Sequence, residues 1–206
     1  KYYVQIQLYT ADWKWICGTD NLEVTVTGGG TPCETFCTQE IVEFKSQADI
    51  DAFCGCEVIE GDVRITGADI TSLEPLKALR KVGGFLAILN TKLENFQGLN
   101  NLESVGDAFV LIKNSQLLNY EGLDRLKIIE SGFSISQNPI LESMEGLNAL
   151  MQINGSISIS NNDQLLNIAA LKNIQKIRSL FILGNKSIKT LKLYILILFL
   201  ILKYGN

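Results

Sequence analysis

Apolar residues recur along this chain with two short periods that follow one another. From Phe133 to Ser136 apolar and polar residues alternate, which is typical of a strand with one buried face. From Leu141 to Ile153 an apolar residue then stands at every third position. Period 3 is too short for an amphipathic helix, whose apolar face recurs at three and four residues alternately. Each unit therefore predicts one strand, a turn and an extended return segment.

This unit occurs about six times between Cys54 and the C-terminus. The first apolar residues of the period-3 parts are spaced by 23 or 24 residues: Ile70, Leu93, Leu117, Leu141, Leu165 and Ile188. Self-similarity at such a period is typical of a solenoid, in which no unit buries its apolar side alone. Stacked units would pair strand on strand into a parallel sheet.

The predicted strands divide their residues between two faces. The inward positions are Val63/Ile65, Leu86/Ile88, Phe109/Leu111, Phe133/Ile135 and Ile157/Ile159. The outward positions between them are Arg64, Ala87, Val110, Ser134 and Ser158. Repeat proteins usually bind partners through such a surface, so these five are the candidate binding residues. The third and sixth strands are ambiguous by one residue, which would exchange their two faces.

A column of asparagines precedes the period-3 parts by three residues. Its members are Asn90, Asn114, Asn138, Asn162 and Asn185, with Gly67 in the first unit. An Asn side chain can bond the backbone of its own turn and of the next unit, and can thus satisfy buried amides. We interpret the column as a structural ladder, with a ligand site as the alternative. The Gly-Leu pairs at 98–99, 122–123 and 146–147 predict corners that only glycine tolerates.

The combined phrase is L-x-I-x-x-N-x-x-L-x-x-L-x-x-L-x-x-L-x-x-I, with a Gly just before the next strand. It resembles the receptor L-domain, the leucine-rich-repeat-like right-handed β-helix of insulin-receptor and EGF-receptor ectodomains, which also occurs in secreted bacterial and protist proteins. The resemblance covers roughly Ile41 to Thr190. It implies a mainly β fold of about six coils with a short N-terminal capping helix. It also implies an extracellular binding module without enzymatic activity. Because ligand contacts vary within this family, no site residue is transferred.

The N-terminal part differs in kind from the repeats. Residues 1–30 alternate like strands and end in a glycine run, which indicates the tail of a preceding β-domain or a lead-in hairpin. Residues 31–56 are predicted to form a cap ahead of the solenoid at 57–190. Within the cap, Ser46 is a good N-cap for a short helix that reaches Phe53.

All five cysteines precede the repeats: Cys17, Cys33, Cys37, Cys54 and Cys56. Their spacings do not match paired C-x-x-C zinc knuckles, and the chain contains no histidine to complete a metal site. Disulfides that staple the cap are therefore favoured over a metal centre. The number is odd and the connectivity stays open.

The last segment, residues 191–206, breaks the pattern. It keeps an apolar residue at every third position, but the residues between become apolar as well, giving ten in succession between Lys192 and Lys203. A membrane-spanning helix needs about 20 residues, so no membrane span is expected. The segment is either a last coil whose outer side packs against something else or a non-native ending.

Composition narrows the function. The net charge of −4, with 18 scattered Lys and Arg residues, argues against nucleic acid. The absence of histidine excludes Ser-His-Asp and Cys-His nucleophile systems and H-E-x-x-H zinc sites. We expect no catalytic residue, no metal and no cofactor.

Three functions remain open. The first is a secreted or cell-surface recognition or adhesion module that binds an unknown protein or carbohydrate partner through the sheet face. The second is a structural spacer, which a featureless sheet face would favour. The third is a polysaccharide-active enzyme on a β-helix, which would need clustered carboxylates. Acids such as Glu94, Glu121 and Glu145 instead stand at polar spacer positions of the return segments, as in a solvated face.

Overall fold

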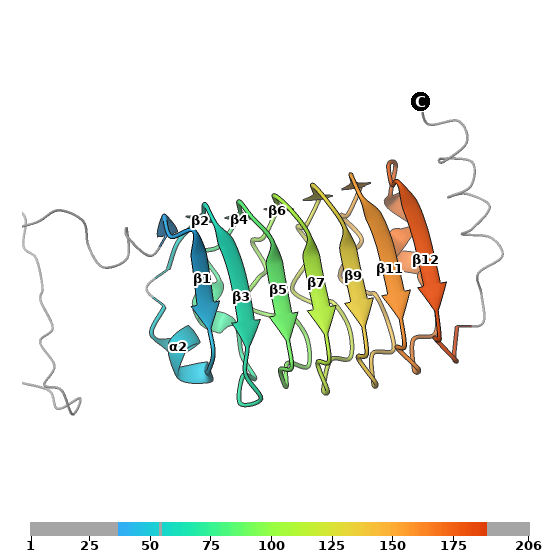
Figure 1. The fold of residues 1–206 in the computed structure, drawn as a ribbon, viewed down its shortest axis with the longest axis horizontal. Coiled ribbons are helices and arrows are strands. Elements are labelled where there is room, and N and C mark those ends of the chain that lie inside the picture. The colour runs from blue at the N-terminus through green and yellow to red at the C-terminus, as the bar shows by residue number, and fades with distance from the viewer. Residues whose placement is uncertain (1–36, 54, 189–206) are drawn as a thin grey trace, which may run out of the picture.

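The computed structural model describes residues 37–53 and 55–188, in which the chain winds into a parallel β-solenoid of about six coils (Figure 1). The long sheet has the strand order β1-β3-β5-β7-β9-β11-β12. These strands are Ile41–Phe44, Asp62–Thr66, Leu86–Leu89, Phe109–Ile112, Phe133–Ser136, Ser156–Ser160 and Ser179–Leu183. The fold class predicted from the two periods is confirmed. The predictions for residues 1–30, for Cys17, Cys33 and Cys54, and for residues 191–206 lie outside the described part.

A second, narrower sheet lies behind the first, in the order β10-β8-β6-β4-β2 (Figure 1). Its two-residue strands are Val58–Ile59, Lys81–Val82, Ser104–Val105, Ile128–Ile129 and Gln152–Ile153. The helical elements with described bounds are α2 (Gln47–Asp51) and two 3-10 turns, η1 (Glu74–Leu76) and η2 (Ala169–Asn173). Along the chain, each two-residue strand of the narrow sheet therefore comes just before a strand of the long sheet.

The register of the long sheet fixes which residues face the core. Phe109 pairs with Leu86 on one side and with Phe133 on the other, and the neighbouring strands continue the row. All ten predicted inward residues of the five middle strands are at most 1% exposed. The sequence leaves the register of the third and sixth strands open by one residue. In the third, β7, the structure places Phe109 and Leu111 inward. In β12 the inward residues are Leu180 and Ile182.

Short turns explain the period of three in the return segments. The amide of Leu99 donates to the carbonyl of Phe96, and the amide of Leu102 donates to that of Leu99, both at 2.9 Å. A chain of such three-residue turns directs every third side chain into the core. At Gly98 the backbone has φ of 104°, and a Cβ there would collide with the carbonyl of Leu73 in the preceding coil. The same holds one and two coils later, which accounts for the Gly-Leu corners.

Asparagine side-chain amides link four successive coils. The Oδ1 atom of Asn138 accepts from the backbone amide and from Nδ2 of Asn114, at 3.0 and 3.2 Å. Its own Nδ2 donates to the carbonyl of Leu111 and to Oδ1 of Asn162. Asn162 is bonded in the same way to Asn185. Each amide oxygen thus receives two hydrogen bonds from the previous coil, so a fully buried turn keeps its polar groups paired.

Asn90 does not belong to this ladder, which corrects the sequence assignment. The segment from Ile88 to Leu93 is one residue shorter than the corresponding segment of the next coil, which runs from Leu111 to Leu117. Thr91 therefore occupies the ladder position and bonds Asn114 Oδ1 through its amide (3.1 Å) and its hydroxyl (2.7 Å). Asn90 is exposed and takes a left-handed conformation with φ of 55°, like Lys113 in the next coil.

The N-terminal end of the solenoid is closed by the cap. Ser46 accepts from the amide of Asp49 at 3.2 Å and begins α2, which ends before Phe53 and is thus shorter than predicted. Phe53 packs edge-on against Phe44 with ring centroids 5.6 Å apart. Cys37 and Cys56 form a disulfide with Cα atoms 5.8 Å apart, so one of the cap staples is identified.

Four aromatic rings pack together in the middle of the core: Phe96, Phe109, Tyr120 and Phe133. Tyr120 is completely buried, and its hydroxyl has no hydrogen-bond partner among the residues that the structure describes. Burial raises the pKa of Tyr120 well above its ordinary range. An unpaired buried hydroxyl costs stability, because it gives up its bonds to water without replacement.

Replacing Asn138 by alanine is expected to lower the free energy of unfolding by about 3 kcal/mol, because it leaves the buried amide of Asn114 unpaired. The measurement is urea denaturation followed by circular dichroism. Asn148→Ala, at an exposed position outside the ladder, is the control and should change stability by less than about 0.5 kcal/mol. Equal losses in the two variants would contradict the ladder's structural role.

Tyr120→Phe is expected to raise the free energy of unfolding by about 1 kcal/mol, because it removes the unpaired hydroxyl and keeps the ring. The same denaturation measurement applies. Tyr120→Leu, which also removes the ring, should instead cost about 2 kcal/mol or more. If the phenylalanine variant were destabilised as well, the hydroxyl would have a partner in solution.

Candidate functional site

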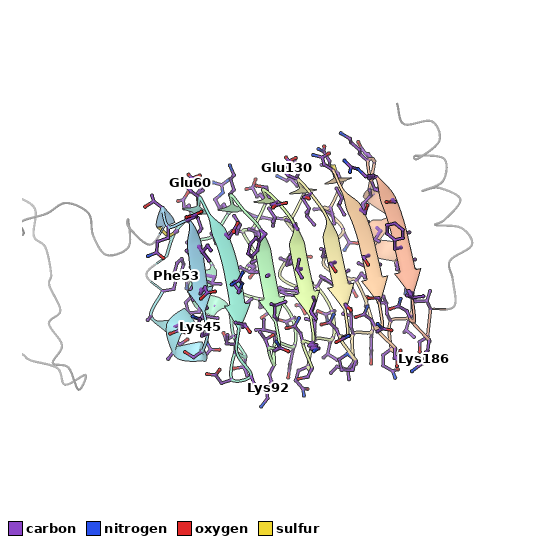
Figure 2. The ribbon with its side chains drawn as sticks, viewed as in Figure 1. Lys45, Phe53, Glu60, Lys92, Glu130 and Lys186 are labelled. Carbon is purple, nitrogen blue, oxygen red and sulfur yellow. A yellow bond between two sulfur atoms is a disulfide. The ribbon has the colours of Figure 1, made fainter. Side chains whose placement is uncertain are left out.

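The outer face of the long sheet carries the predicted binding residues in one row. Strand pairing places Arg64 beside Ala87, then Val110, Ser134 and Ser158. Glu43 of β1 and Phe181 of β12 extend the row at its two ends. Side chains stand out from this face and from both rims, where Lys45 and Lys186 lie on the side to which the strands point and Glu60 and Glu130 on the other (Figure 2). The five predicted residues are thus neighbours on one flat surface.

The first part of this face, on β1 and β3, is charged. The Glu43 carboxylate lies 2.7 Å from the Arg64 guanidinium and 2.8 Å from Lys45 Nζ. The hydrogen bond from Lys45, and then that from Arg64, lowers the pKa of Glu43 below its ordinary value. Arg64 also lies over the ring of Phe85, 5.6 Å from its centroid. This guanidinium is therefore held in place by an ion pair and by an aromatic face.

The middle of the face is apolar. On β5 and β7, and on the residue just before each, the outward side chains are Phe85, Ala87, Leu89, Ala108, Val110 and Ile112, which we call the apolar band. Ala87 is only 6% exposed, because larger side chains surround it. The other five are half-buried. The sequence predicts only the central row of this face, and the two flanking rows show that the apolar character is continuous across β5 and β7.

Serines cover the next part of the face. The outward residues of β9 and β11 and the first residue of β12 are Ser134, Ser136, Ser156, Ser158, Ser160 and Ser179. The hydroxyls of Ser156 and Ser179 lie 2.7 Å apart, and Ser160 donates to Ser136 at 3.0 Å. Beyond them Phe181 and Leu183 of β12 are 58% and 72% exposed. The face therefore changes from charged to apolar to hydroxyl-bearing along the stack.

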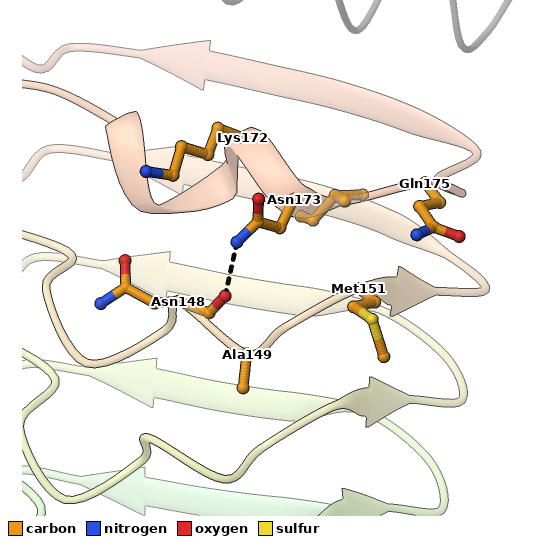
Figure 3. Close-up of a pocket in the computed structure, with 7 residues that line it drawn as sticks. Asn148, Ala149, Met151, Lys172, Asn173 and Gln175 are labelled. Atoms are coloured by element: carbon orange, nitrogen blue, oxygen red, sulfur yellow. Dashed lines mark hydrogen bonds between the residues drawn. The ribbon is translucent and has the colours of Figure 1, made fainter.

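A hollow of about 580 Å³ lies on the return side, between the fourth and fifth coils (Figure 3). Its lining consists of Asn148, Ala149, Met151, Lys172, Asn173, Ile174 and Gln175. Asn173 Nδ2 donates to the carbonyl of Asn148 at 2.7 Å across it. No motif in the sequence predicts this hollow, whose lining includes Ala149 at the position that the longer Arg125 occupies one coil earlier.

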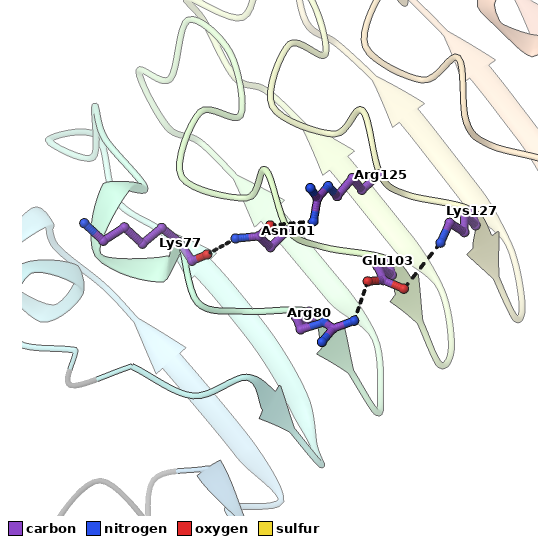
Figure 4. Close-up of polar contacts among 6 residues, drawn as sticks. All are labelled: Lys77, Arg80, Asn101, Glu103, Arg125 and Lys127. Atoms are coloured by element: carbon purple, nitrogen blue, oxygen red, sulfur yellow. Dashed lines mark hydrogen bonds and ion pairs between the residues drawn. The ribbon is translucent and has the colours of Figure 1, made fainter.

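Charged groups beside the narrow sheet pair with one another between coils (Figure 4). Glu103 bonds Arg80 at 2.7 Å and Lys127 at 3.4 Å, so the pKa of Glu103 is lowered, first by Arg80 and then by Lys127. Asn101 links the carbonyl of Lys77 to Arg125 in the same manner. Exposed pairs of this kind contribute little stability. They do give these polar side chains of the return segments a hydrogen-bond or ion-pair partner in the neighbouring coil.

The fold and its surfaces define a class of protein: a parallel β-solenoid with a disulfide-stapled cap and a long sheet face open to solvent. The family model of the receptor L domain matches residues 55–141. This match confirms the resemblance predicted from the repeat. The long-sheet strands outside the matched range, β1, β11 and β12, continue the same register. Comparison with curated proteins and with solved structures found no match.

Receptor L domains are non-catalytic, extracellular ligand-binding modules of receptor ectodomains. Within residues 37–53 and 55–188, no three His, Cys, Asp or Glu side chains are grouped so that they could hold a metal ion. No helix in that part of the chain is long and apolar enough to cross a membrane. The match therefore directs attention to the surfaces that can contact a ligand.

Titration of Glu43 tests the charged part of the face. Its pKa, followed by NMR, should lie below 4.5 and should rise more in Lys45→Ala than in Arg64→Ala, because the Lys45 bond contributes most. Because the folded pKa lies below the unfolded value, the stabilisation is present above the unfolded pKa and is lost as the pH falls through the folded one. Lys77→Ala, which removes a distant charge, should leave this titration unchanged.

Proposed function

We propose that the chain is an extracellular recognition module that binds a protein partner through the outer face of the long sheet. The apolar band carries this proposal. Its six outward side chains lie outside the core cluster, and all but Ala87 remain partly open to solvent. An apolar centre with a polar surround is the anatomy of a protein interface. Here Arg64 and Glu43 lie on one side of the centre and the serine hydroxyls on the other.

Rigidity supports the same conclusion. Each inner strand of the long sheet is paired on both sides, from β3 to β11. Such a face loses little conformational freedom when a partner docks on it, so more of the contact energy appears as affinity. The cap disulfide is compatible with the oxidising extracellular compartment.

A carbohydrate partner has weaker support on this face. Sugars stack on open aromatic rings, whereas Phe85 in the band lies beneath the guanidinium of Arg64, and the exposed ring of Phe181 lies on β12, away from the band. The spacer alternative leaves the band unexplained, because a spacer needs only the inward residues and the ladder. The hollow beside Met151 offers amides, a lysine and a thioether, and is the second candidate surface.

The test is a binding screen of the oxidised full chain on arrays of protein ectodomains and of glycans. Val110→Ser with Ile112→Ser should weaken a protein hit by about tenfold or more, since central apolar contacts dominate interface energies. Met151→Ser with Leu166→Ser makes the same chemical change at exposed return-side positions and is the matched control.

Each other outcome changes the assignment. A hit that only the control variant loses would move the site to the return side. Binding to glycans alone would replace the protein partner by a carbohydrate. A folded chain that binds nothing on either array would favour the spacer.

A further inference from the structure

The bends that lead into the middle strands of the long sheet are acidic. Glu60, Asp107 and Glu130 lie in the bends before β3, β7 and β9, and all three are exposed. The equivalent bend before β5 is Gly83-Gly84, so these four bends contain no lysine or arginine. Glu60 and Glu130 both lie along this side of the sheet (Figure 2), which we call the acidic rim.

The bends at the other ends of the strands carry the opposite charge beside the apolar band. Lys92 and Lys113 follow β5 and β7, the two strands of the band, and Lys45 follows β1. All three lysines are exposed. Lys45 and Lys92 lie along this side (Figure 2), which we call the basic rim. The apolar band is therefore bordered by carboxylates at one end of its strands and by ammonium groups at the other.

The charges that border the band are available to a partner. Within the part of the chain that the structure describes, the side chains of Asp107, Lys92 and Lys113 form no ion pair and no hydrogen bond. The acids in the bends of the basic rim, Asp69 and Asp163, each accept a hydrogen bond from a neighbouring group instead. The field across the band is thus set by its two rims, one negative and one positive.

Two copies of this face can meet about a two-fold axis in two ways. The axis lies in the plane of contact, because each copy faces the other. An axis along the strands sets acidic rim against acidic rim, which is repulsive. An axis along the stack of coils sets the acidic rim of one copy against the basic rim of the other and keeps each coil opposite its own counterpart. Asp107 and Lys113 flank the same strand, so this axis brings each toward the other across the contact.

The same axis matches every part of the face with its own kind. The apolar band meets the apolar band, and two such sheets pack about 10 Å apart with interdigitated side chains. The Glu43–Arg64 ion pair, which is neutral as a unit, meets the same pair of the other copy. Serine hydroxyls both donate and accept, so the serines of β9 and β11 also suit one another. The face is therefore self-complementary in charge, polarity and hydrogen bonding.

We propose that the partner of the apolar band is a second copy of this chain, in a dimer whose two-fold axis runs along the stack of coils. The inference rests on the proposed function, since both use the outer face of the long sheet. The strands of this face from β3 to β9 are only four or five residues long, so the contact is small. Dimers of such size dissociate readily, and we expect a Kd on the order of 10 µM.

Sedimentation of the full, oxidised chain between about 1 and about 500 µM tests the dimer, because this range spans the expected Kd. The unaltered chain should pass from monomer to dimer. Val110→Ser with Ile112→Ser, which makes the band polar, should stay monomeric throughout. Met151→Ser with Leu166→Ser, on the return side, should dimerise as the unaltered chain does. A chain that remains monomeric over the whole range would overturn the inference.

Charge reversal tests the direction of the axis. Lys92→Glu with Lys113→Glu makes both rims acidic beside the band, and Asp107→Lys with Glu130→Lys makes both basic. Each variant alone should be monomeric at about 100 µM, and an equimolar mixture should form a heterodimer, because acidic rims then face basic rims again. The heterodimer also shows that both variants fold. Dimers of either variant alone, or two folded variants that stay apart in the mixture, would contradict this axis.

The failure of this inference is distinguishable from the failure of the recognition function. A monomeric chain whose array hit is lost in the Val110→Ser, Ile112→Ser variant would exclude the second copy and leave recognition through the band intact. Dimers that persist in that variant would place self-association on another surface and overturn the inference, whatever the arrays show.

Discussion

Stacking in this molecule depends on the pairing of polar groups inside a turn that is closed to water. Every coil must bend sharply after its long strand, and the bend is buried because the next coil lies on it. The amides of Asn114, Asn138 and Asn162 solve the problem by bonding the turn of one coil to the ladder residue of the next. Where the bend is one residue shorter, Thr91 provides the contact with its amide and hydroxyl. The coils are thereby held at a fixed spacing and register.

The same stacking constraint divides the residues into those that stabilise the fold and those that are free to contact a ligand. The core is supplied by alternate residues of the long strands and by every third residue of the return segments, and in such a solenoid each coil is stabilised mainly by its neighbours. The outward residues of the long sheet are left out of this arrangement. Their chemistry can therefore differ from coil to coil, as it does between Arg64, Val110 and Ser134, while the backbone beneath them stays the same.

Periodicity made most of the fold predictable. The inward residues followed from alternation in the strands, and the corners followed from glycines such as Gly122 that need a positive φ. The error at Asn90 arose because leucine spacing hides a loop that is one residue shorter, and only strand pairing reveals it. The outward row was predicted as a column, but the apolar band was not, since it becomes continuous only when Phe85 and Leu89 lie beside Ala108 and Ile112. The hollow beside Met151 depends on side-chain sizes in two coils and has no signature along the chain.

The apolar band is difficult to explain by stability alone. Serines occupy the equivalent outward positions of β9 and β11, and those strands pair as regularly as β5 and β7 do. Serine at the band would therefore serve the sheet equally well. Half-buried apolar side chains on an open sheet face carry a risk of aggregation, which a spacer has no reason to bear. A surface that keeps such residues in two adjacent strands, while its neighbours keep charges and hydroxyls, is better explained by contact with a partner than by the needs of the solenoid.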